Sequence, residues 1–551
     1  MTGKHWSSFT QVNDPITHVG KDDFYNNDIG FYVEDTWKAK PSLTFNLGVR
    51  YDLQHVPPPA TPNTARPLLT LYTSTLNIDK NNIAPRLGVA WQIGTKTVLR
   101  AGYGMFIGKT SNSTYYALRV ENGVYQQTFS GCSPTSGSTA LRGCAPTFPN
   151  VFFTPPGPAV AAPFAGALTP TVGIPGGTLP AASTAVHGMV PDFVNPTAHE
   201  AELTIERQLP GRMSFSATYL LTRGIHLPAS YDANVAPAGT PFLNSSGTLI
   251  NPVATATYDV LASSAAGAAT ALTTTVPYYT SRLDSPSGLI LNQYSIINTW
   301  YNGLVLSLRK PMSHDVELLF NYTYSHALDT GQTSGTNGTF FGTDGVLDPY
   351  NLKQDYANSD LDQRHRFVGS VVWAPTYGKD MSNAIARQLV NGWTASAIIT
   401  SATGQPYQAN IGTSVITPFG SNASPVDGGL TGGEVSTFAG PTGGRVSWLA
   451  RNPYFLPNYT DVDFRLGRGI TFHEKYNLTF SVDAFNLFNS TIVAAKNTTA
   501  YTYAGPGSSS ACTAAHTHGC LVPSSSFGSI TTTSGSLYGA RQLQINAKFN
   551  F

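Results

Sequence analysis

Two cysteines and two histidines lie close together near the end of the chain, in the segment Cys512-Thr-Ala-Ala-His-Thr-His-Gly-Cys520. Thiolates and imidazoles are the preferred ligands of zinc and copper, so this segment could hold a soft metal ion. The alternative is a short disulfide in an exported loop, where oxidising conditions favour it and the histidines are incidental. We favour the disulfide and predict no metal site.

A second group of ionisable residues comprises Asp360, Asp362 and His365, flanked by Arg364 and Arg366. These residue types could bind a metal or transfer protons, but the alternation of the following residues places them where a strand begins. Ion pairs with neighbouring strands explain the same residues, and we favour that structural role.

Other matches to catalytic motifs are incomplete. The glycines of Gly102-Tyr-Gly104-Met-Phe-Ile-Gly108 miss the dinucleotide-binding spacing by one position and open no helix. Neither His199-Glu200 nor His473-Glu474 is followed by a second histidine at the zinc-protease spacing, and no nucleophile-elbow pattern is present. We therefore predict that the chain is not an enzyme and has no cofactor.

The composition indicates a membrane protein built from strands. Only 11% of the 551 residues are charged, compared with about 25% in typical soluble proteins. The net charge of +1 gives no electrostatic reason to expect a nucleic-acid partner. No run of 18 apolar residues exists to form a transmembrane helix, so a closed barrel is the membrane-compatible alternative.

The last residues show the pattern of a membrane-spanning strand. Apolar and polar residues alternate without a fault from Arg541 to the end, and the apolar set is Leu543, Ile545, Ala547, Phe549 and Phe551. A strand that crosses the hydrocarbon core needs roughly 9 to 11 residues, apolar outward and polar inward. We expect this strand to mediate contact with the barrel-assembly machinery.

The same alternation recurs along the chain in hairpins with short turns, which gives about 13 to 14 strands. The paired segments are 29–37 with 43–51, 87–93 with 99–105, 201–207 with 213–221, 304–308 with 316–324, 367–373 with 393–401, and 462–466 with 478–484. This pattern predicts an all-β fold, an antiparallel transmembrane outer-membrane β-barrel occupying residues 28–551, preceded by a polar segment, 1–27, that is a loop or a weak strand.

Successive hairpins are joined by long connections, as expected of extracellular loops, whereas short turns face the periplasm. The predicted long loops are 53–82, 107–198, 223–297, 326–363, 402–458 and 487–539. All four cysteines fall in these loops, and Cys132 with Cys144 is the second candidate disulfide beside Cys512 with Cys520. Bacterial barrels close with an even number of strands, so either Lys4 to Val12 adds a fourteenth or the chain is the back portion of a larger barrel.

Several segments resemble TonB-dependent receptors of the Oar-like type, and in the order found in the C-terminal part of such a barrel. They are Gly30-Phe-Tyr-Val-Glu-Asp-Thr-Trp-Lys38, Leu43 to Asp52, Ala84 to Trp91, Leu99 to Phe106, Asp360 to Phe367, Asn391-Gly-Trp-Thr-Ala-Ser-Ala397, Thr403-Gly-Gln-Pro-Tyr407 and Asp483-Ala-Phe-Asn-Leu-Phe-Asn489. The resemblance implies a barrel of about 22 strands with a plugged lumen, energised by an inner-membrane TonB-type complex. The sequence shows no plug-like domain, energy-coupling box, carboxypeptidase-regulatory-like domain or signal peptide, so we expect Met1 to mark a truncated gene model or a fragment.

Within such a barrel the polar members of each strand would face the lumen. The charged candidates are Arg50, Asp52, Arg100, Glu202, Glu206, Asp461, Asp463, Arg465 and Asp483. Aromatic residues near strand ends would form the girdles at the lipid surface, and they are Trp37, Tyr51, Trp91, Tyr324, Trp373 and Phe485.

The predicted function is uptake of a polar solute such as an oligosaccharide, a peptide or a chelate across the outer membrane of a Gram-negative cell. Outer-membrane lipid is the expected partner, and the TonB-type complex is a partner only if a missing N-terminal part exists. Two alternatives remain open. One is a stand-alone passive porin of about 14 strands. The other is a surface adhesin that uses its long loops, such as Pro155 to Ala185 and Ala254 to Val276, for contact.

Overall fold

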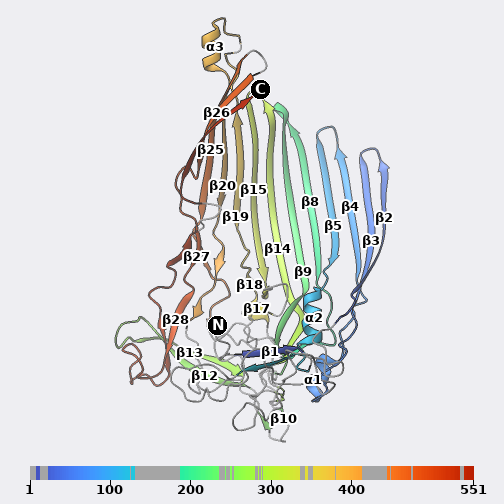
Figure 1. Ribbon diagram of the computed structural model, residues 1–551, viewed down its shortest axis with the longest axis vertical. Helices are drawn as coiled ribbons and strands as arrows, with labels where there is room; N and C mark the ends of the chain where they lie inside the picture. The colour runs from blue at the N-terminus through green and yellow to red at the C-terminus, as the bar shows by residue number, and fades with distance from the viewer. Residues whose placement is uncertain are drawn as a thin grey trace, which may run out of the picture.

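A computed structural model describes most of the chain (Figure 1). The described residues are 8–12, 23–124, 126–130, 186–234, 242–243, 249–250, 253–279, 283–284, 287, 290–334, 342–344, 352–378, 380–412, 444–446, 448–472, 476–533 and 539–551. Among them, no helix is both long and apolar enough to cross a membrane. The predicted pair of Cys132 and Cys144 lies outside the described residues.

One large curved antiparallel sheet forms the body of the protein (Figure 1). Its strands pair in the order β2 (Asn27–Lys40), β3 (Leu43–His55), β4 (Ile83–Ile93), β5 (Thr97–Ile107), β8 (Thr197–Leu209), β9 (Met213–Asp232), β14 (Ile290–Ser313), β15 (Val316–Asp329), β19 (His365–Trp373), β20 (Trp393–Ala402), β25 (Tyr459–Phe472), β26 (Tyr476–Phe485) and β31 (Gln542–Asn550). This all-antiparallel order confirms the predicted fold class, because every predicted hairpin is present and each pairs with the next.

The connections differ in length at the two ends of this sheet. At the turn end, strands β2 and β3 meet after Lys40, and β4 and β5 are joined through Gly94, whose φ of 68° suits a tight turn. The three-residue helix η2 (Pro210–Arg212) joins β8 to β9 at the same end. Long segments join the hairpins at the opposite end, here called the loop end.

Two strands extend further than the sequence pattern indicates. The loop predicted at 223–297 is shorter, because β9 continues to Asp232 and β14 begins at Ile290, with Leu291 still paired to Asp232. The short strands β7 (Val186–Met189) and β18 (Ala357–Asn358) pair with β14 and β15 at the same end. The prediction therefore covered the central part of these strands and missed their continuation, where the start of β14 shows no period of two and the pairing of β9 with β14 shifts register between Ser295 and Thr299.

The possible fourteenth strand has a different place. Residues Ser8–Val12 do form a strand, β1, but it pairs with β6 (Gln126–Ser130) in a separate two-stranded sheet. It therefore adds nothing to the large sheet. Within the described residues that sheet has thirteen consecutive strands, and β2 and β31 stand at its two edges.

The loop end is itself folded. A six-stranded sheet, here called the loop layer, has the order β13 (Thr270–Tyr279), β12 (Val253–Leu261), β29 (Gly519–Pro523), β28 (Thr499–Ala504), β22 (Asn410–Ile411) and β23 (Gly444–Arg445). The buried side chains of Tyr258, Val260, Ile411, Val446 and Leu521 form its core. Segments from three different connections thus share one apolar core.

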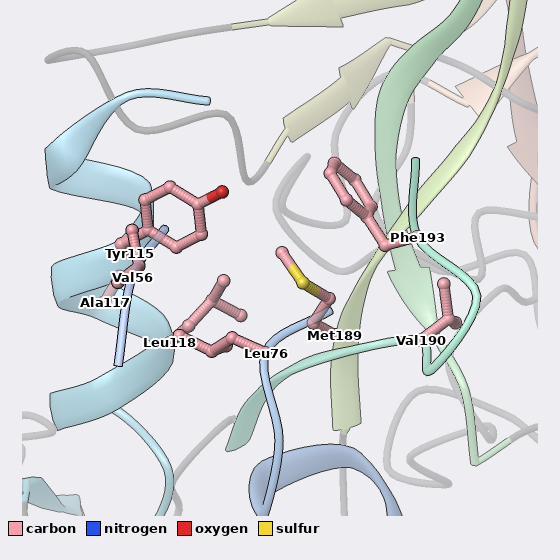
Figure 2. Packing of buried hydrophobic residues seen from close by; sticks show 8 residues of the cluster. All are labelled: Val56, Leu76, Tyr115, Ala117, Leu118, Met189, Val190 and Phe193. Carbon is pink, nitrogen blue, oxygen red and sulfur yellow. The ribbon is translucent and has the colours of Figure 1, made fainter. Parts of the chain in front are cut away.

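Two helices cover another part of the loop end, α1 (Pro67–Thr73) and α2 (Asn112–Val120). Tyr115 and Leu118 of α2 pack against Val56, Leu76 and the segment from Met189 to Phe193 (Figure 2). Shorter elements complete the structure: β10 (Phe242–Leu243), β11 (Leu249–Ile250), β16 (Gln332–Ser334), β17 (Gly342–Asp344), η4 (Leu352–Asp355), α3 (Ala384–Val390), β21 (Pro406–Tyr407), β24 (Tyr454–Phe455), β27 (Val493–Lys496) and β30 (Ile530–Thr533).

Candidate functional site

The strand registers give the large sheet one apolar and one polar face. Leu304 of β14 lies opposite Tyr219 of β9 and Tyr324 of β15, and the next pairs on this face, two residues on, are again apolar. Because side chains alternate along a strand, the residues between them share the other face. That polar face carries mostly Ser, Thr, Asn, Gly and charged residues.

All nine charged candidates belong to the polar set. Leu43, Phe45, Leu47, Val49 and Tyr51 alternate with polar residues that include Arg50 and Asp52 on β3. The registers align this set from β2 to β31, so Arg100, Glu202, Glu206, Asp461, Asp463, Arg465 and Asp483 fall on the same face. The polar face is therefore continuous across the whole sheet.

Two bidentate ion pairs lie on the polar face. Within β3, the Nε and Nη2 atoms of Arg50 donate to the carboxylate of Asp52 at 2.7 and 2.8 Å. Between β25 and β26, the same two atoms of Arg465 donate to Asp483 at 2.5 and 2.8 Å. Asn546 of β31 adds a 2.7 Å hydrogen bond to Asp483. These pairs hold four of the candidate charges at fixed positions near opposite edges of the sheet.

The other candidates have different partners. Glu202 and Glu206 of β8 lie opposite Gly102 and Val98 of β5, and neither neighbour is charged. Asp463 accepts a 2.9 Å hydrogen bond from the backbone N–H of Asn486, so it closes the loop that follows β26. Asp463 is therefore a structural residue here, whereas the side chains of Glu202 and Glu206 are exposed and accessible from the polar face.

Five of the six aromatic candidates belong to the apolar set, whereas Phe485, the last residue of β26, follows Ala484 and has the parity of Asp483 on the polar face. Trp37, Trp91, Tyr324, Trp373 and Phe485 are all exposed. Trp37 stacks on Phe45 with ring centroids 5.4 Å apart, and the Tyr51 hydroxyl donates to the Lys80 carbonyl at 3.2 Å. In the terminal strand, Leu543, Ile545 and Phe551 are 70%, 80% and 89% exposed, and Phe549 is 54% exposed. Such exposure of large apolar side chains suits contact with lipid rather than water.

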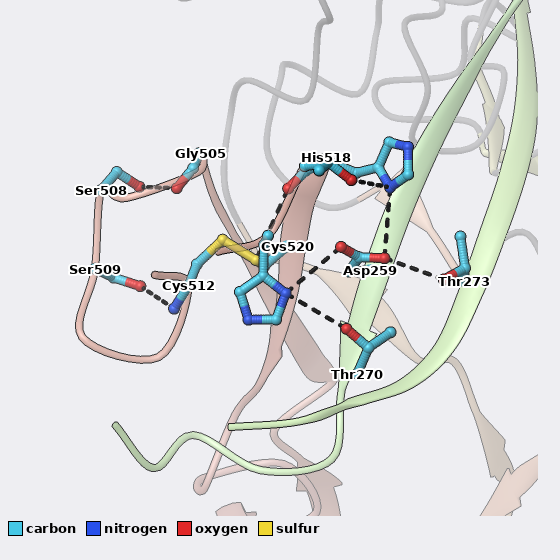
Figure 3. The surroundings of a disulfide bond; sticks show 11 residues. Asp259, Thr270, Thr273, Gly505, Ser508, Ser509, Cys512, His518 and Cys520 are labelled. Carbon is cyan, nitrogen blue, oxygen red and sulfur yellow. Dashed lines mark hydrogen bonds and ion pairs between the residues drawn. A yellow bond between two sulfur atoms is a disulfide. The ribbon is translucent and has the colours of Figure 1, made fainter. Parts of the chain in front are cut away.

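Cys512 and Cys520 form a disulfide in the loop layer, where Cys520 belongs to β29 between β12 and β28; their Cα atoms are 5.8 Å apart (Figure 3). Both histidines between them face Asp259 of β12: His516 Nδ1 lies 3.5 Å and His518 Nδ1 lies 3.6 Å from its carboxylate oxygens. Thr273 of β13 also donates to Asp259 at 3.0 Å. The histidines thus connect the disulfide segment to the β12–β13 hairpin.

The disulfide should stabilise the loop layer. It closes a short loop with a sequence separation of 8, and both sulfur-bearing residues are fully buried. Loop-closure entropy gives such a bridge about 2.5 kcal/mol. We expect Cys512→Ser with Cys520→Ser to lower the free energy of local unfolding of β28 and β29 by that amount, measured by amide hydrogen exchange. Unchanged exchange in β29 would contradict this, and the transmembrane strands serve as the internal reference.

The group at Asp360, Asp362 and His365 does not converge on one point. Asp362 is buried, accepts the backbone N–H of Ala327 at 2.7 Å and pairs with Arg364 at 3.3 Å. His365 stands on the apolar face, where its Nδ1 lies 2.8 Å from the Tyr322 hydroxyl. In the part of the chain that the structure describes, no group of three or more His, Cys, Asp or Glu residues could hold a metal ion.

Buried ion pairs at the loop end gave no signal in the sequence. Arg445 of β23 and Asp355 of η4 form a 2.7 Å pair in which both side chains are at most 2% exposed. Burial lowers the pKa of Arg445, and the charge of Asp355 opposes that effect. Arg451 pairs with Asp329. These partners lie far apart in the sequence, so no local motif could have indicated them.

A further ion pair joins two loops near α1. Arg66 holds both carboxylate oxygens of Asp284, and Ser287 donates to the same carboxylate. The hydrogen bonds from Arg66 lower the pKa of Asp284 below its ordinary value. The loop end is thus cross-linked by ion pairs as well as by the disulfide.

Comparison with known proteins gives a family. The family model described as "Outer membrane beta barrel domain" matches residues 8–544. No curated protein is similar in sequence. Similar solved structures include the outer membrane transporter YddB from Escherichia coli (11% identity, TM-score 0.42, covering 85% of this chain and 42% of that one). The FrpB iron transporter from Neisseria meningitidis is another (10% identity, TM-score 0.40, covering 96% and 46%).

This chain spans less than half the length of these solved proteins. The family match, by contrast, covers nearly the whole chain and agrees with the antiparallel sheet and its apolar face. In such barrels the short turns face the periplasm and the long loops face outward. The chain belongs to the outer membrane beta barrel domain family, and its place in the cell is the outer membrane.

Proposed function

We propose that this chain forms the wall of a TonB-dependent uptake channel for a polar solute. The observation that carries the proposal is the continuous polar face, with its two Arg–Asp pairs and the carboxylates of Glu202 and Glu206. Ionised side chains are costly in lipid, and in barrel proteins they line the watery interior. We therefore take this face as the lumen.

Lumen chemistry suggests the class of solute. Serine, threonine and asparagine side chains offer hydrogen bonds, and the charges of both signs are partly paired on the wall. A polar solute such as an oligosaccharide, a peptide or a chelate could exchange its water for these groups. A hydrophobic solute would find no matching surface there.

The folded loop end supports selective uptake rather than an open pore. Its disulfide, buried ion pairs and shared apolar core hold the long connections in one arrangement. A passive porin needs no such layer above its lumen. The energised mechanism, the 22-stranded closure and the TonB-type partner rest on the sequence resemblance, and contact of β31 with the assembly machinery rests on its exposed apolar residues.

An uptake assay in cells that express this chain tests the proposed function. Accumulation of polar solutes should depend on the chain and should stop when the proton gradient across the inner membrane is dissipated. Glu202→Gln with Glu206→Gln should change the rate or selectivity at least several-fold, whereas Leu203→Val on the apolar face should not. Flux that survives loss of the gradient would instead indicate a passive pore. Absence of any flux, with surface binding retained, would favour the adhesin.

A further inference from the structure

Helix α3 (Ala384–Val390) stands out at the turn end, where the other described connections are short turns. It lies between β19 and β20 and projects beyond the ends of the strands (Figure 1). The Asn383 side chain caps it by accepting the backbone N–H groups of Ile385 and Ala386 at 3.0 and 3.1 Å. A capped helix in this position is a defined element with its own surface.

That surface is unusually apolar. Ile385 and Leu389 are 73% and 58% exposed, and their spacing of four puts them on one side of the helix. Tyr377 and Met381, in the segment leading to the helix, are exposed as well. Helices in water turn their apolar side toward a protein core, so these residues need another partner.

A hydrogen bond shows which side of the sheet holds the helix. The indole Nε1 of Trp393 donates to the carbonyl of Leu389 at 3.0 Å. Trp393 is paired with Arg468 of β25 and belongs to the apolar set that continues with Leu466 and Phe464. The C-terminal end of α3 is therefore attached to the apolar, lipid-facing side of the sheet.

We propose that α3 is an interfacial anchor that lies in the phospholipid leaflet at the periplasmic side of the outer membrane. Its apolar residues continue the lipid-facing surface of β19, β20 and β25 past the strand ends. The guanidinium of Arg468 lies 5.1 Å from the Trp393 ring, and Arg387 is exposed on the helix itself. Both cations suit phosphate headgroups, as do the exposed residues Lys40, Lys96 and Arg212, which lie in more distant turns at the same end of the sheet.

Fluorescence quenching in isolated outer membranes tests the anchor. An environment-sensitive fluorescent amino acid is placed at position 385 of the full chain, and in matched samples at position 47 on the lipid-facing part of β3 and position 96 in an exposed turn. Spin-labelled phospholipids should quench position 385 nearly as strongly as position 47, and at least threefold more strongly than position 96. The proposal would be overturned if spin-labelled phospholipids quenched positions 385 and 96 equally and a water-soluble quencher reached the label at position 385.

The same assay separates lipid from a protein partner. A label at position 385 that neither quencher reaches would mean that protein covers the helix, and this also overturns the proposal. A second variant, Ile385→Asp with Leu389→Asp, changes only exposed side chains, so the barrel should still fold. With the label at position 381, we expect this variant to lose at least half of the quenching by lipid, whereas unchanged quenching would contradict the anchor. The outcome is independent of solute uptake.

Discussion

Substitution of Gly392 by alanine should be among the most destabilising single changes in the large sheet. Gly392 has a φ of 81°, and a Cβ atom there would lie 2.3 Å from the carbonyl oxygen of Gly469. The left-handed backbone costs alanine about 1 to 2 kcal/mol. Backbone atoms of β25 must then move as well, since Gly469 also donates its N–H to the Gly392 carbonyl at 2.8 Å. We expect a loss of free energy of unfolding on the order of 4 kcal/mol.

Gly94 provides a matched control for this prediction. It has a φ of 68° in the turn between β4 and β5, but a Cβ atom there would meet nothing within 4 Å. Gly94→Ala should therefore cost only the backbone term, about 1 to 2 kcal/mol. Urea unfolding in lipid vesicles, followed by the mobility shift of folded barrels on gels, gives both values. Equal losses in the two variants would refute the role assigned to the contact with Gly469.

Removal of the Asp355 carboxylate should open the loop end. Asp355→Ala leaves the Arg445 guanidinium without its carboxylate partner in a site where the side chain is 2% exposed. Breaking a buried ion pair by removing one partner costs about 3 to 5 kcal/mol, because the remaining charge stays desolvated. We expect hydrogen exchange in β22 and β23, and protease cleavage of the loops on intact cells, to increase accordingly.

Two further variants separate the charge effect from other causes. Asp360→Ala removes a carboxylate that is 45% exposed, lies 4.0 Å from Arg451 and accepts a hydrogen bond from the Asn452 amide, so it should cost about 1 to 2 kcal/mol. Asp355→Leu combined with Arg445→Met replaces the pair by apolar groups and should recover most of the loss. If the double variant were as unstable as Asp355→Ala, an uncompensated charge would not be the cause.

The sequence predicted the large sheet because alternation is a local signal. Residues such as Leu43, Phe45 and Leu47 reveal their face without knowledge of any partner, and short turns then dictate antiparallel pairing. Most predicted loop bounds fall within a few residues of the strand ends. The connection between β9 and β14 does not, because both strands continue beyond the register shifts between Ser295 and Thr299.

The loop end could not be predicted in the same way. Tyr258 of β12 pairs with Gly519 of β29, and Arg451 reaches Asp329, so the contacts join residues that no period relates. His516 and His518 lie close to Asp259 only because β12 pairs with β29. Helix α3 did leave a local signal, since Asn383 precedes Ile385 and Leu389 at helical spacing, but the seven-residue helix is too short for periodicity to be decisive.

Some motif residues acquire a physical reason only in the structure. In Thr403-Gly-Gln-Pro-Tyr407, a Cβ atom at Gly404 would lie 2.0 Å from the Leu456 carbonyl oxygen, so only glycine allows this approach. In Asp483 to Asn489, the Asn486 side chain donates to the carbonyls of Ser490 and Gly539 and thereby fixes the exit of β26. The resemblance to known receptors thus rests partly on backbone geometry.

The parallel pairing of β12 with β29 constrains the order of assembly. It joins residues 258–260 to residues 519–521, and antiparallel pairing of β29 with β28 completes the same sheet. The β12–β13 hairpin can form on its own, but β12 gains its second partner strand only after β29 has been synthesised. Insertion of the early strands into the membrane and folding of the loop layer are therefore separate stages. Folding of the loop layer needs β29, which lies near the C-terminal end of the polypeptide.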